Sequence, residues 1–159
     1  RHVSEGVRLL VVGSGSGILA IVALLLGAKA AVGTDLDPCA SEAVADNCLA
    51  NNIATDRFKM LLGNIITSQS IRDEIGYDGF DIVTANILTE VLVPLTPVIV
   101  PHLKKGGLYI TSGILSKQED GTMTNKVNVI SDAIKAAGME VLEVTYQGEW
   151  ASVTARKPL

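Results

Sequence analysis

The chain has 159 residues, 48% of them hydrophobic, and a formal net charge of −4, which together suit a single domain over residues 1–159 with a substantial core. No basic cluster is longer than Lys104-Lys105, which disfavours a large nucleic-acid footprint, so no direct nucleic-acid partner is expected. The longest apolar run, Ile18 to Leu26, is too short to span a bilayer, and the first ten residues do not resemble a signal peptide, so we expect a cytoplasmic protein with no membrane partner.

The first predicted elements form a strand–helix–strand unit built around a glycine-rich turn. The apolar run Leu9-Leu10-Val11-Val12 leads into Gly13-Ser14-Gly15-Ser16-Gly17, a pattern typical of a buried strand that ends in a tight turn. A helical run follows, and Asp35 ends a second apolar strand, 22 residues after Gly13. Glycines that let the backbone approach a ligand, together with a carboxylate that accepts hydrogen bonds from ribose hydroxyls, predict an adenosine-binding site.

The spacing of the glycines distinguishes between two kinds of adenosine ligand. Dinucleotide sites have a small residue at the sixth position of G-x-G-x-x-G, which lets the helix pack closely and present its N-terminus to a pyrophosphate. Here the sixth position is Ile18, and the last glycine falls at the fifth, at Gly17. The G-x-G-x-G form is typical of S-adenosylmethionine-dependent methyltransferases, whose ligand has no phosphate. An ordinary left-handed turn without a ligand is the alternative.

The second predicted helix begins at Pro38, a residue that the first turn of a helix tolerates, and it carries both cysteines. Cys39 and Cys48 are nine residues apart, which is about 13 Å along a helix and too far for a disulfide. We therefore expect both to be reduced thiols. Neither cysteine has metal-ligand spacing, and His2 and His102 have no partner motif, so no metal site is expected.

Strand-like and helix-like runs alternate along the chain. Strands are expected near 8–12, 30–35, 57–62, 80–85 and 107–112, and helices near 17–26, 38–52, 87–103 and 125–138. Pro94, Pro97 and Pro101 should kink the fourth helix or delay its start. Repeated strand–helix alternation implies right-handed crossovers, and therefore an α/β fold with a doubly wound, mostly parallel sheet.

The end of the chain departs from this alternation. Met139 to Gln147 and Trp150 to Arg156 are two strand-like runs joined by Gly148-Glu149, and they predict a C-terminal antiparallel β-hairpin. A doubly wound sheet that ends in such a hairpin is the architecture of the Rossmann-like methyltransferase fold and is not usual for dehydrogenases.

Several stretches, spread over most of the chain, carry a more specific resemblance. They are Gly13 to Ala23, Gly33 to Pro38, Ala85 to Leu92, Leu103 to Gln118 and Gly148 to Trp150. In these stretches the chain resembles the catalytic domain of ribosomal protein L11 methyltransferases, bacterial enzymes that methylate amino groups on a large-subunit ribosomal protein. The Asn-Ile-Leu after the fourth strand and the Ser-Gly-Ile-Leu after the fifth are more diagnostic than the glycine turn, which many methyltransferase families share.

The resemblance implies an activity, a cofactor and a partner. The expected enzyme is a protein N-methyltransferase that moves a methyl group from S-adenosylmethionine to a lysine side chain or an N-terminal amine of a ribosomal protein. The reaction would be in-line transfer from sulfur to nitrogen, in which the protein mainly positions the reactants and offers a route for proton loss. The oligomeric state does not follow from the resemblance.

The resemblance also assigns roles to single residues. It implies cofactor contacts by Gly13, Ser14, Gly15, Gly17, Asp35, Asn64 and Asn86, with Asn86 as the catalytic residue. Asp35 would bind the ribose hydroxyls, and Asn64 stands where the family commonly has an acid that meets the adenine amine. Asn86 would orient a neutral target amine toward the sulfonium methyl group. Without the resemblance, Asn86 is expected to cap the following helix, as Asp37 is expected to cap the second one.

Two departures from the family pattern leave other functions open. The acid usually found two positions before the first glycine is Val11 here, which should weaken cofactor binding. The chain begins at Arg1 without the family's N-terminal substrate-recognition domain, so an isolated catalytic domain, or a fragment of a longer protein, is expected. Both departures make a catalytically silent cofactor-binding or scaffold domain one alternative. A NAD(P)-binding dehydrogenase domain is the other, disfavoured by Ile18 and by the terminal hairpin.

Overall fold

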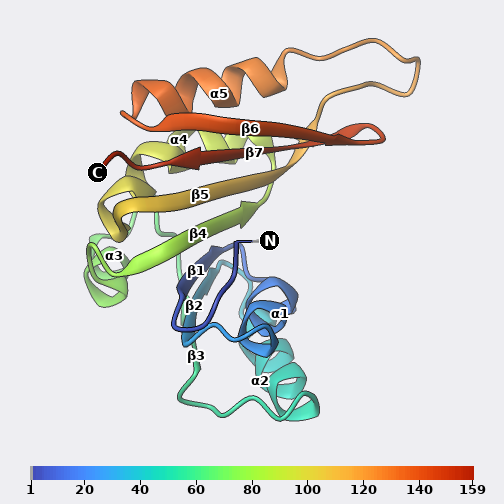
Figure 1. Ribbon diagram of the computed structural model, residues 1–159. Helices are drawn as coiled ribbons and strands as arrows, with labels where there is room; N and C mark the ends of the chain where they lie inside the picture. The colour runs from blue at the N-terminus through green and yellow to red at the C-terminus, as the bar shows by residue number, and fades with distance from the viewer. Residues whose placement is uncertain (1) are drawn as a thin grey trace.

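A seven-stranded β-sheet runs through the molecule, with helices packed on both of its faces (Figure 1). The computed structural model describes residues 2–159. The strands are β1 Arg8–Val12, β2 Ala30–Asp35, β3 Phe58–Leu62, β4 Phe80–Asn86, β5 Leu103–Leu115, β6 Glu140–Gln147 and β7 Trp150–Arg156. The helices are α1 Ile18–Leu25, α2 Cys39–Ala50, α3 Gln69–Ile75, α4 Thr89–Ile99 and α5 Lys126–Ala136, with a 3-10 turn, η1, at Val100–His102.

The order of the strands across the sheet is β3-β2-β1-β4-β5-β7-β6. The strands from β3 to β5 in this order pair in parallel, whereas β7 pairs antiparallel with both β5 and β6. The chain moves from β1 outward to β2 and β3 and then returns to the other side of β1 with β4, so the strand order reverses between β1 and β4. The expected doubly wound, mostly parallel sheet with a C-terminal antiparallel hairpin is confirmed.

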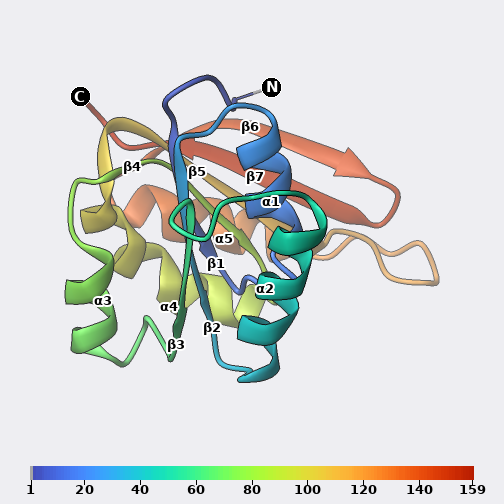
Figure 2. The ribbon, with the colours of Figure 1, turned by 90° about the horizontal axis from the view of Figure 1, so that it is seen from below.

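Two apolar clusters, one on each face of the sheet, form the core. In β1, Leu10 and Val12 belong to the cluster beneath α3, α4 and α5, whereas Leu9 and Val11 belong to the cluster beneath α1 and α2. This division follows from the period of two in a β-strand, and it explains why a strand covered on both faces is apolar at successive positions. Figure 2 shows α1 and α2 on one side of β1, β2 and β3, and α3 and α4 on the other.

The fourth helix and the strand after it differ in extent from the sequence prediction. α4 starts at Thr89, continues through Pro94 and Pro97, and gives way to η1 around Pro101. Because Thr89 precedes all three prolines, they do not delay the start of the helix as expected. β5 is longer than the predicted strand over 107–112, because it begins directly after η1 and continues past a β-bulge.

The structure also contains one helix that the sequence analysis did not predict, α3. Ser68 caps its first turn by accepting a hydrogen bond from the Ile71 N–H at 3.3 Å. Arg72 donates hydrogen bonds to the carbonyl oxygens of Ile65 and Ile66 at 2.7 and 2.8 Å, which ties α3 to the segment after β3. A helix this short is not stable on its own, so these contacts rather than its composition account for it.

Other sequence expectations concern membranes, metals and thiols. In the described part of the chain, every helix is too short or too polar to cross a bilayer. Residues 2–159 also contain no cluster of three or more His, Cys, Asp or Glu side chains that could hold a metal ion. Cys39 and Cys48 lie on α2 as free thiols, and burial raises the pKa of Cys48.

Candidate active site

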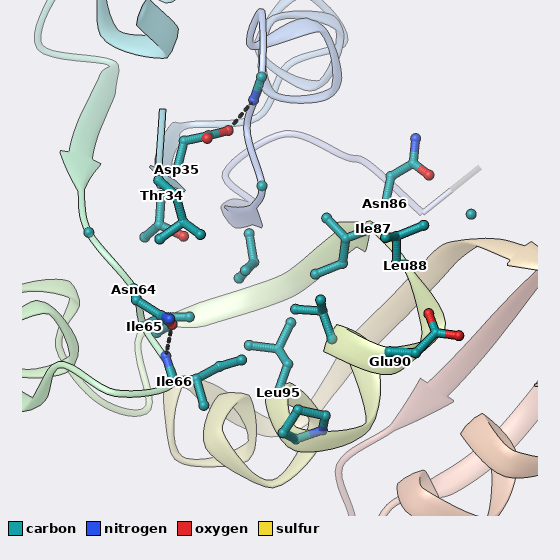
Figure 3. A pocket seen from close by; sticks show the side chains of 18 of the residues that line it. Thr34, Asp35, Asn64, Ile65, Ile66, Asn86, Ile87, Leu88, Glu90 and Leu95 are labelled. Carbon is teal, nitrogen blue, oxygen red and sulfur yellow. Dashed lines mark hydrogen bonds between the residues drawn. The ribbon is translucent and has the colours of Figure 1, made fainter. Parts of the chain in front are cut away.

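A cleft of about 780 Å³ opens at the carboxyl ends of the parallel strands (Figure 3). Its walls come from the ends of β1, β2, β3 and β4, from the first turns of α4, and from Gly113 and Trp150. This is the edge at which open α/β sheets bind ligands, and it lies where the strand order reverses. The topology therefore gathers residues that are far apart in the sequence.

The glycine turn forms the wall next to β1. The N–H groups of Gly13 and Ser14 both donate to the Thr34 carbonyl oxygen, at 2.9 and 3.0 Å, which holds the turn against the end of β2. Gly13 has a φ of +73°, and a Cβ there would lie 2.6 Å from the Ile87 side chain, so only glycine fits. Gly15 has a φ of +54°, and a Cβ there would meet no atom within 4 Å, so its backbone borders open space in the cleft.

Asp35 links this turn to the start of α2. Its Oδ2 accepts a hydrogen bond from the Gly15 N–H at 2.8 Å, and its Oδ1 accepts one from the Asp37 N–H at 2.9 Å. Each carboxylate oxygen has a second lone pair, so Asp35 can still accept a hydrogen bond at both oxygens. Asp37 accepts a hydrogen bond from the Cys39 N–H at 2.9 Å, and because Pro38 already has helical dihedrals, this bond caps the first turn of α2 as expected.

Asn64 lies at the opposite end of the same wall, after β3. Its Oδ1 accepts a hydrogen bond from the Ile66 N–H at 2.9 Å, which fixes the amide beside the cleft (Figure 3). One lone pair of that oxygen remains for a ligand donor such as an aromatic amine. Leu36, 69% exposed, and the partly buried Ile66 add apolar surface to the lining. The arrangement suits a flat ring with a polar edge.

Asn86, the last residue of β4, lies across the cleft from Asp35 in Figure 3. The cap position of α4 is Leu88, and no side chain caps that helix, so Asn86 does not have the capping role that is the alternative to an active-site role. Its Oδ1 would lie 2.9 Å from a Cβ on Gly113, which shows how closely β5 approaches it. Asn86 is also exposed and lines the cleft.

The packing of Gly113 against Asn86 leads to a stability prediction. Gly113 has a φ of +76°, and a Cβ there would also lie 3.1 Å from the Ile87 carbonyl oxygen, so Gly113→Ala combines backbone strain with a steric clash. We expect the free energy of unfolding to fall by about 2–4 kcal/mol. Gly148→Ala is the matched control, because Gly148 has a φ of +60° but open space around it. Its expected loss is about 1–2 kcal/mol. Urea denaturation of both variants compares the two losses. Equal losses would mean that Asn86 and Ile87 move away from the new methyl group without lowering the free energy of unfolding.

Ser14 and Gly17, both predicted to contact the cofactor, are not among the residues that line the cleft. The Ser14 side chain is buried, and its Oγ would lie 2.8 Å from a Cβ on Gly33. Gly17, with a φ of +82°, packs where a Cβ would come within 2.9 Å of both Val44 and Phe58. The structure thus places both residues toward the core beneath the turn.

Glu90 and Leu88 line the cleft, which the sequence analysis did not predict. Glu90, in the first turn of α4, lines the cleft and pairs with Lys126 at 3.0 Å. Hydrogen bonds from its own backbone N–H and from Lys126 hold the pKa of Glu90 below its usual value. Leu88 lines the cleft with 67% of its surface exposed. An acid in a first helical turn and an apolar residue before a helix are common patterns, so neither marks a site in the sequence.

Trp150 contributes to the cleft from the start of β7. It is 48% exposed and lies at the cleft margin next to Gly113. A tryptophan in a hairpin is usually a packing residue, but this one lines the cleft. The structure supports the position at the edge of the cleft.

Comparison with known proteins adds independent information. The family model for ribosomal protein L11 methyltransferase (PrmA) matches residues 1–158. The ribosomal protein L11 methyltransferase of Agathobacter rectalis is 44% identical over 153 residues, covering 96% of this chain and 45% of the relative. That of Lachnospira eligens is 43% identical over 158 residues, covering 99% of this chain and 47% of the relative. The chain thus spans about half the length of these curated relatives.

Solved structures show the same fold. The crystal structure of ribosomal protein L11 methylase from Lactobacillus delbrueckii subsp. bulgaricus superposes with a TM-score of 0.81 at 27% identity, covering 98% of this chain and 72% of that chain. An S-adenosylmethionine dependent methyltransferase from Mesorhizobium loti superposes with a TM-score of 0.78 at 13% identity, covering 99% of this chain and 93% of that chain, and at that identity it shows the fold alone.

Proposed function

The chain belongs to the ribosomal protein L11 methyltransferase (PrmA) family, and from that premise we propose that it transfers methyl groups from S-adenosylmethionine to amino groups of a ribosomal protein. The main observation that supports the proposal is the cleft in which Asp35 and the glycine turn face Asn86. Lysine side chains or an N-terminal amine are the acceptors. Membership of this family argues against the NAD(P)-dependent dehydrogenase that the sequence left as an alternative.

The residues of the cleft support the choice of cofactor. The charged residues among the described residues that line it are Asp35 and Glu90, and Glu90 is paired with Lys126 at 3.0 Å. An acid such as Asp35 serves the adenosine ribose in dinucleotide sites as well, so the feature that disfavours a pyrophosphate is the glycine spacing, with Ile18 in place of the small sixth residue. A sulfonium ligand has no phosphate and does not need that close approach of the helix. When bound, S-adenosylmethionine supplies a methyl group already activated for attack by a nucleophile.

The binding groups match the parts of that molecule. Asp35, with one free acceptor site on each oxygen, would accept hydrogen bonds from the two ribose hydroxyls. Gly15 would border the cofactor, because its missing side chain leaves open space in the cleft. Asn64 would accept a hydrogen bond from the adenine amine through its remaining lone pair.

Asn86 would act on the acceptor. Its amide oxygen accepts a hydrogen bond from a neutral amine, which turns the nitrogen lone pair toward the methyl group. The amine nitrogen would take the methyl group that the cofactor supplies, with the sulfur–carbon electron pair staying on sulfur, and the methylated ammonium would release its proton to water at the open cleft. The acceptor arrives as a neutral amine, so the protein supplies orientation rather than a strong base.

Asn86→Asp separates this role from a structural one. A carboxylate beside the amine favours its ammonium form, which has no lone pair, so methyl transfer should fall at least about tenfold. Affinity for S-adenosylhomocysteine should stay within about twofold, since the side chain keeps nearly the same shape. Asn125→Asp is the control, because Asn125 is an exposed residue at the start of α5 and does not line the cleft. Wild-type turnover in Asn86→Asp would remove Asn86 from the acceptor site.

The activity itself is tested with purified ribosomal protein L11 as the acceptor and S-adenosylmethionine labelled in its methyl group. The proposal expects label in the acceptor with the wild-type chain and almost none with Asp35→Ala. Binding of the cofactor without any transfer would instead support the catalytically silent domain.

A further inference from the structure

A second, smaller hollow adjoins the cleft on its Trp150 side. It has a volume of about 320 Å³ and lies between the end of β5 and the tip of the β6–β7 hairpin. Gly113 and Trp150 line both hollows, so the two lie next to each other. We refer to this second hollow, lined further by Ser112, Thr145, Tyr146 and Gln147, as the hairpin groove.

A β-bulge creates the hairpin groove. The pairing of β5 with β7 shifts register between Thr111 and Ile114, so Ser112 and Gly113 fall out of the regular ladder. Ser152 spans the gap by donating a hydrogen bond from its Oγ to the Thr111 carbonyl oxygen at 2.7 Å. Bulges of this kind bend a strand and redirect its side chains, often beside active sites. The bulge here opens the sheet next to the amine position proposed at Asn86, which pairs with Ser112 across β4 and β5.

The chemistry of the lining limits what the hairpin groove can bind. The described residues around it are uncharged, and they combine hydroxyl and amide groups with two aromatic rings. Tyr146 is 58% exposed and Trp150 is 48% exposed, so both rings are open to a ligand. Hydroxyl and amide groups pair with peptide N–H and C=O groups, and half-exposed rings pack against small side chains. At this volume the groove suits a few residues of a chain rather than a second cofactor.

We propose that the hairpin groove binds the uncharged peptide segment that flanks the target amine in the acceptor protein. The inference rests on the proposed function, because the shared residues Gly113 and Trp150 and the pairing of Ser112 with Asn86 would set the segment beside the amine. Tyr146 and Gln147 are specificity-determining residues that hold the acceptor backbone, while Asn86 orients the amine. The groove thereby selects acceptors by the peptide beside the amine and not by the amine alone.

The first test compares acceptors with and without flanking peptide. The double variant Tyr146→Ala, Gln147→Ala removes one ring and one amide, and Leu142→Ala is the control, an exposed residue on the same strand that lines neither hollow. With purified ribosomal protein L11 as acceptor, kcat/KM should fall about tenfold or more in the double variant, chiefly through KM. With Nα-acetyl-lysine methylamide it should stay within about twofold of the wild-type value. Equal losses on both acceptors, or no loss on either, would overturn the proposal.

A second measurement needs no turnover. Trp150 is the one tryptophan of the chain, so its fluorescence reports directly on the groove. A short peptide with one lysine between alanines and glycines, blocked at both ends, is titrated into the protein saturated with S-adenosylhomocysteine. A saturable change is expected for the wild type, with binding about fivefold or more weaker in the double variant. The same affinity in both proteins would refute the groove assignment. Failure of the wild type to bind S-adenosylhomocysteine would instead refute the proposed function.

Discussion

Asp35→Ala is expected to weaken binding of S-adenosylhomocysteine by about 2–4 kcal/mol, which corresponds to roughly 30- to 1000-fold in Kd. The variant removes the carboxylate that would accept both ribose hydroxyls. It also frees the Gly15 N–H, which Asp35 holds at 2.8 Å, so the glycine turn loses the contact that orders it before the ligand arrives. Isothermal titration calorimetry measures the affinity, and circular dichroism checks that the fold is kept.

Asp37→Ala is the matched control for this experiment. Asp37 is a neighbouring carboxylate that caps α2 through the Cys39 N–H and does not line the cleft. Its removal should lower the free energy of unfolding by about 1 kcal/mol and leave the affinity for S-adenosylhomocysteine nearly unchanged. Unchanged affinity in Asp35→Ala, or an equal loss in both variants, would remove Asp35 from the ribose site.

Val11→Asp is expected to destabilise the domain by about 3–5 kcal/mol at pH 7. Val11 is fully buried in the apolar cluster beneath α1 and α2. An acid there would restore the usual family residue, whose absence is expected from the sequence to weaken cofactor binding. The buried position of Val11 instead predicts that an acid disturbs the fold, because the turn that Val11 precedes is already held by Thr34 and Asp35 without it.

The same variant should depend on pH. Burial raises the pKa of a carboxyl group above its unfolded value of about 3.9, so the folded state holds the proton over a wider range. The variant is therefore most stable below the unfolded pKa and loses stability as pH rises through its raised folded pKa. Urea denaturation at pH 5 and pH 7 measures the change.

Val11→Asn is the control for charge, since an asparagine side chain has nearly the same shape as aspartate and does not titrate between pH 5 and pH 7. The hydroxyl groups of Ser14 and Thr84 are buried without hydrogen-bond partners among the described residues, and Val11 is in register with Thr84 and with Gly33, near Ser14. Both hydroxyls are positioned to donate to the new side chain, so the asparagine variant should lose less stability than the aspartate one. Wild-type stability together with tighter S-adenosylmethionine binding in Val11→Asp would show that these hydroxyls complete a carboxylate site.

Much of the site could be predicted because parallel strands end at a shared edge. Asp35, Asn64 and Asn86 each follow an apolar strand, and the alternation of strands and helices suffices to bring such residues together. The hairpin and the order of elements followed from equally local signals. The fold class is therefore readable from patterns that repeat over short distances.

What could not be predicted depends on three-dimensional contacts. Ser14 and Gly17 belong to the glycine run, yet the path of the turn directs these two into the core while Gly13 and Gly15 border the cleft. Helix α3 depends on hydrogen bonds from Arg72 to the segment before it. Glu90 lines the cleft only because α4 begins where β4 ends beside the switch in strand order. No local pattern encodes these placements.

The hairpin groove is the clearest case of this kind. It arises where Ser112 and Gly113 leave the β5–β7 ladder, and the sequence marks them only as the end of a strand. The bulge can be recognised once β7 is known to pair antiparallel with β5, since a shift of register then leaves residues unpaired.

The measurement that tests the account most directly is isothermal titration calorimetry of the wild-type chain with S-adenosylhomocysteine and, separately, with NAD. The account predicts one saturable site for S-adenosylhomocysteine and no measurable binding of NAD, because Ile18 stands where a dinucleotide site has a small residue that lets the helix approach the pyrophosphate. Binding of NAD, or the absence of S-adenosylhomocysteine binding, would contradict the assignment of this cleft as the cofactor site of a methyltransferase.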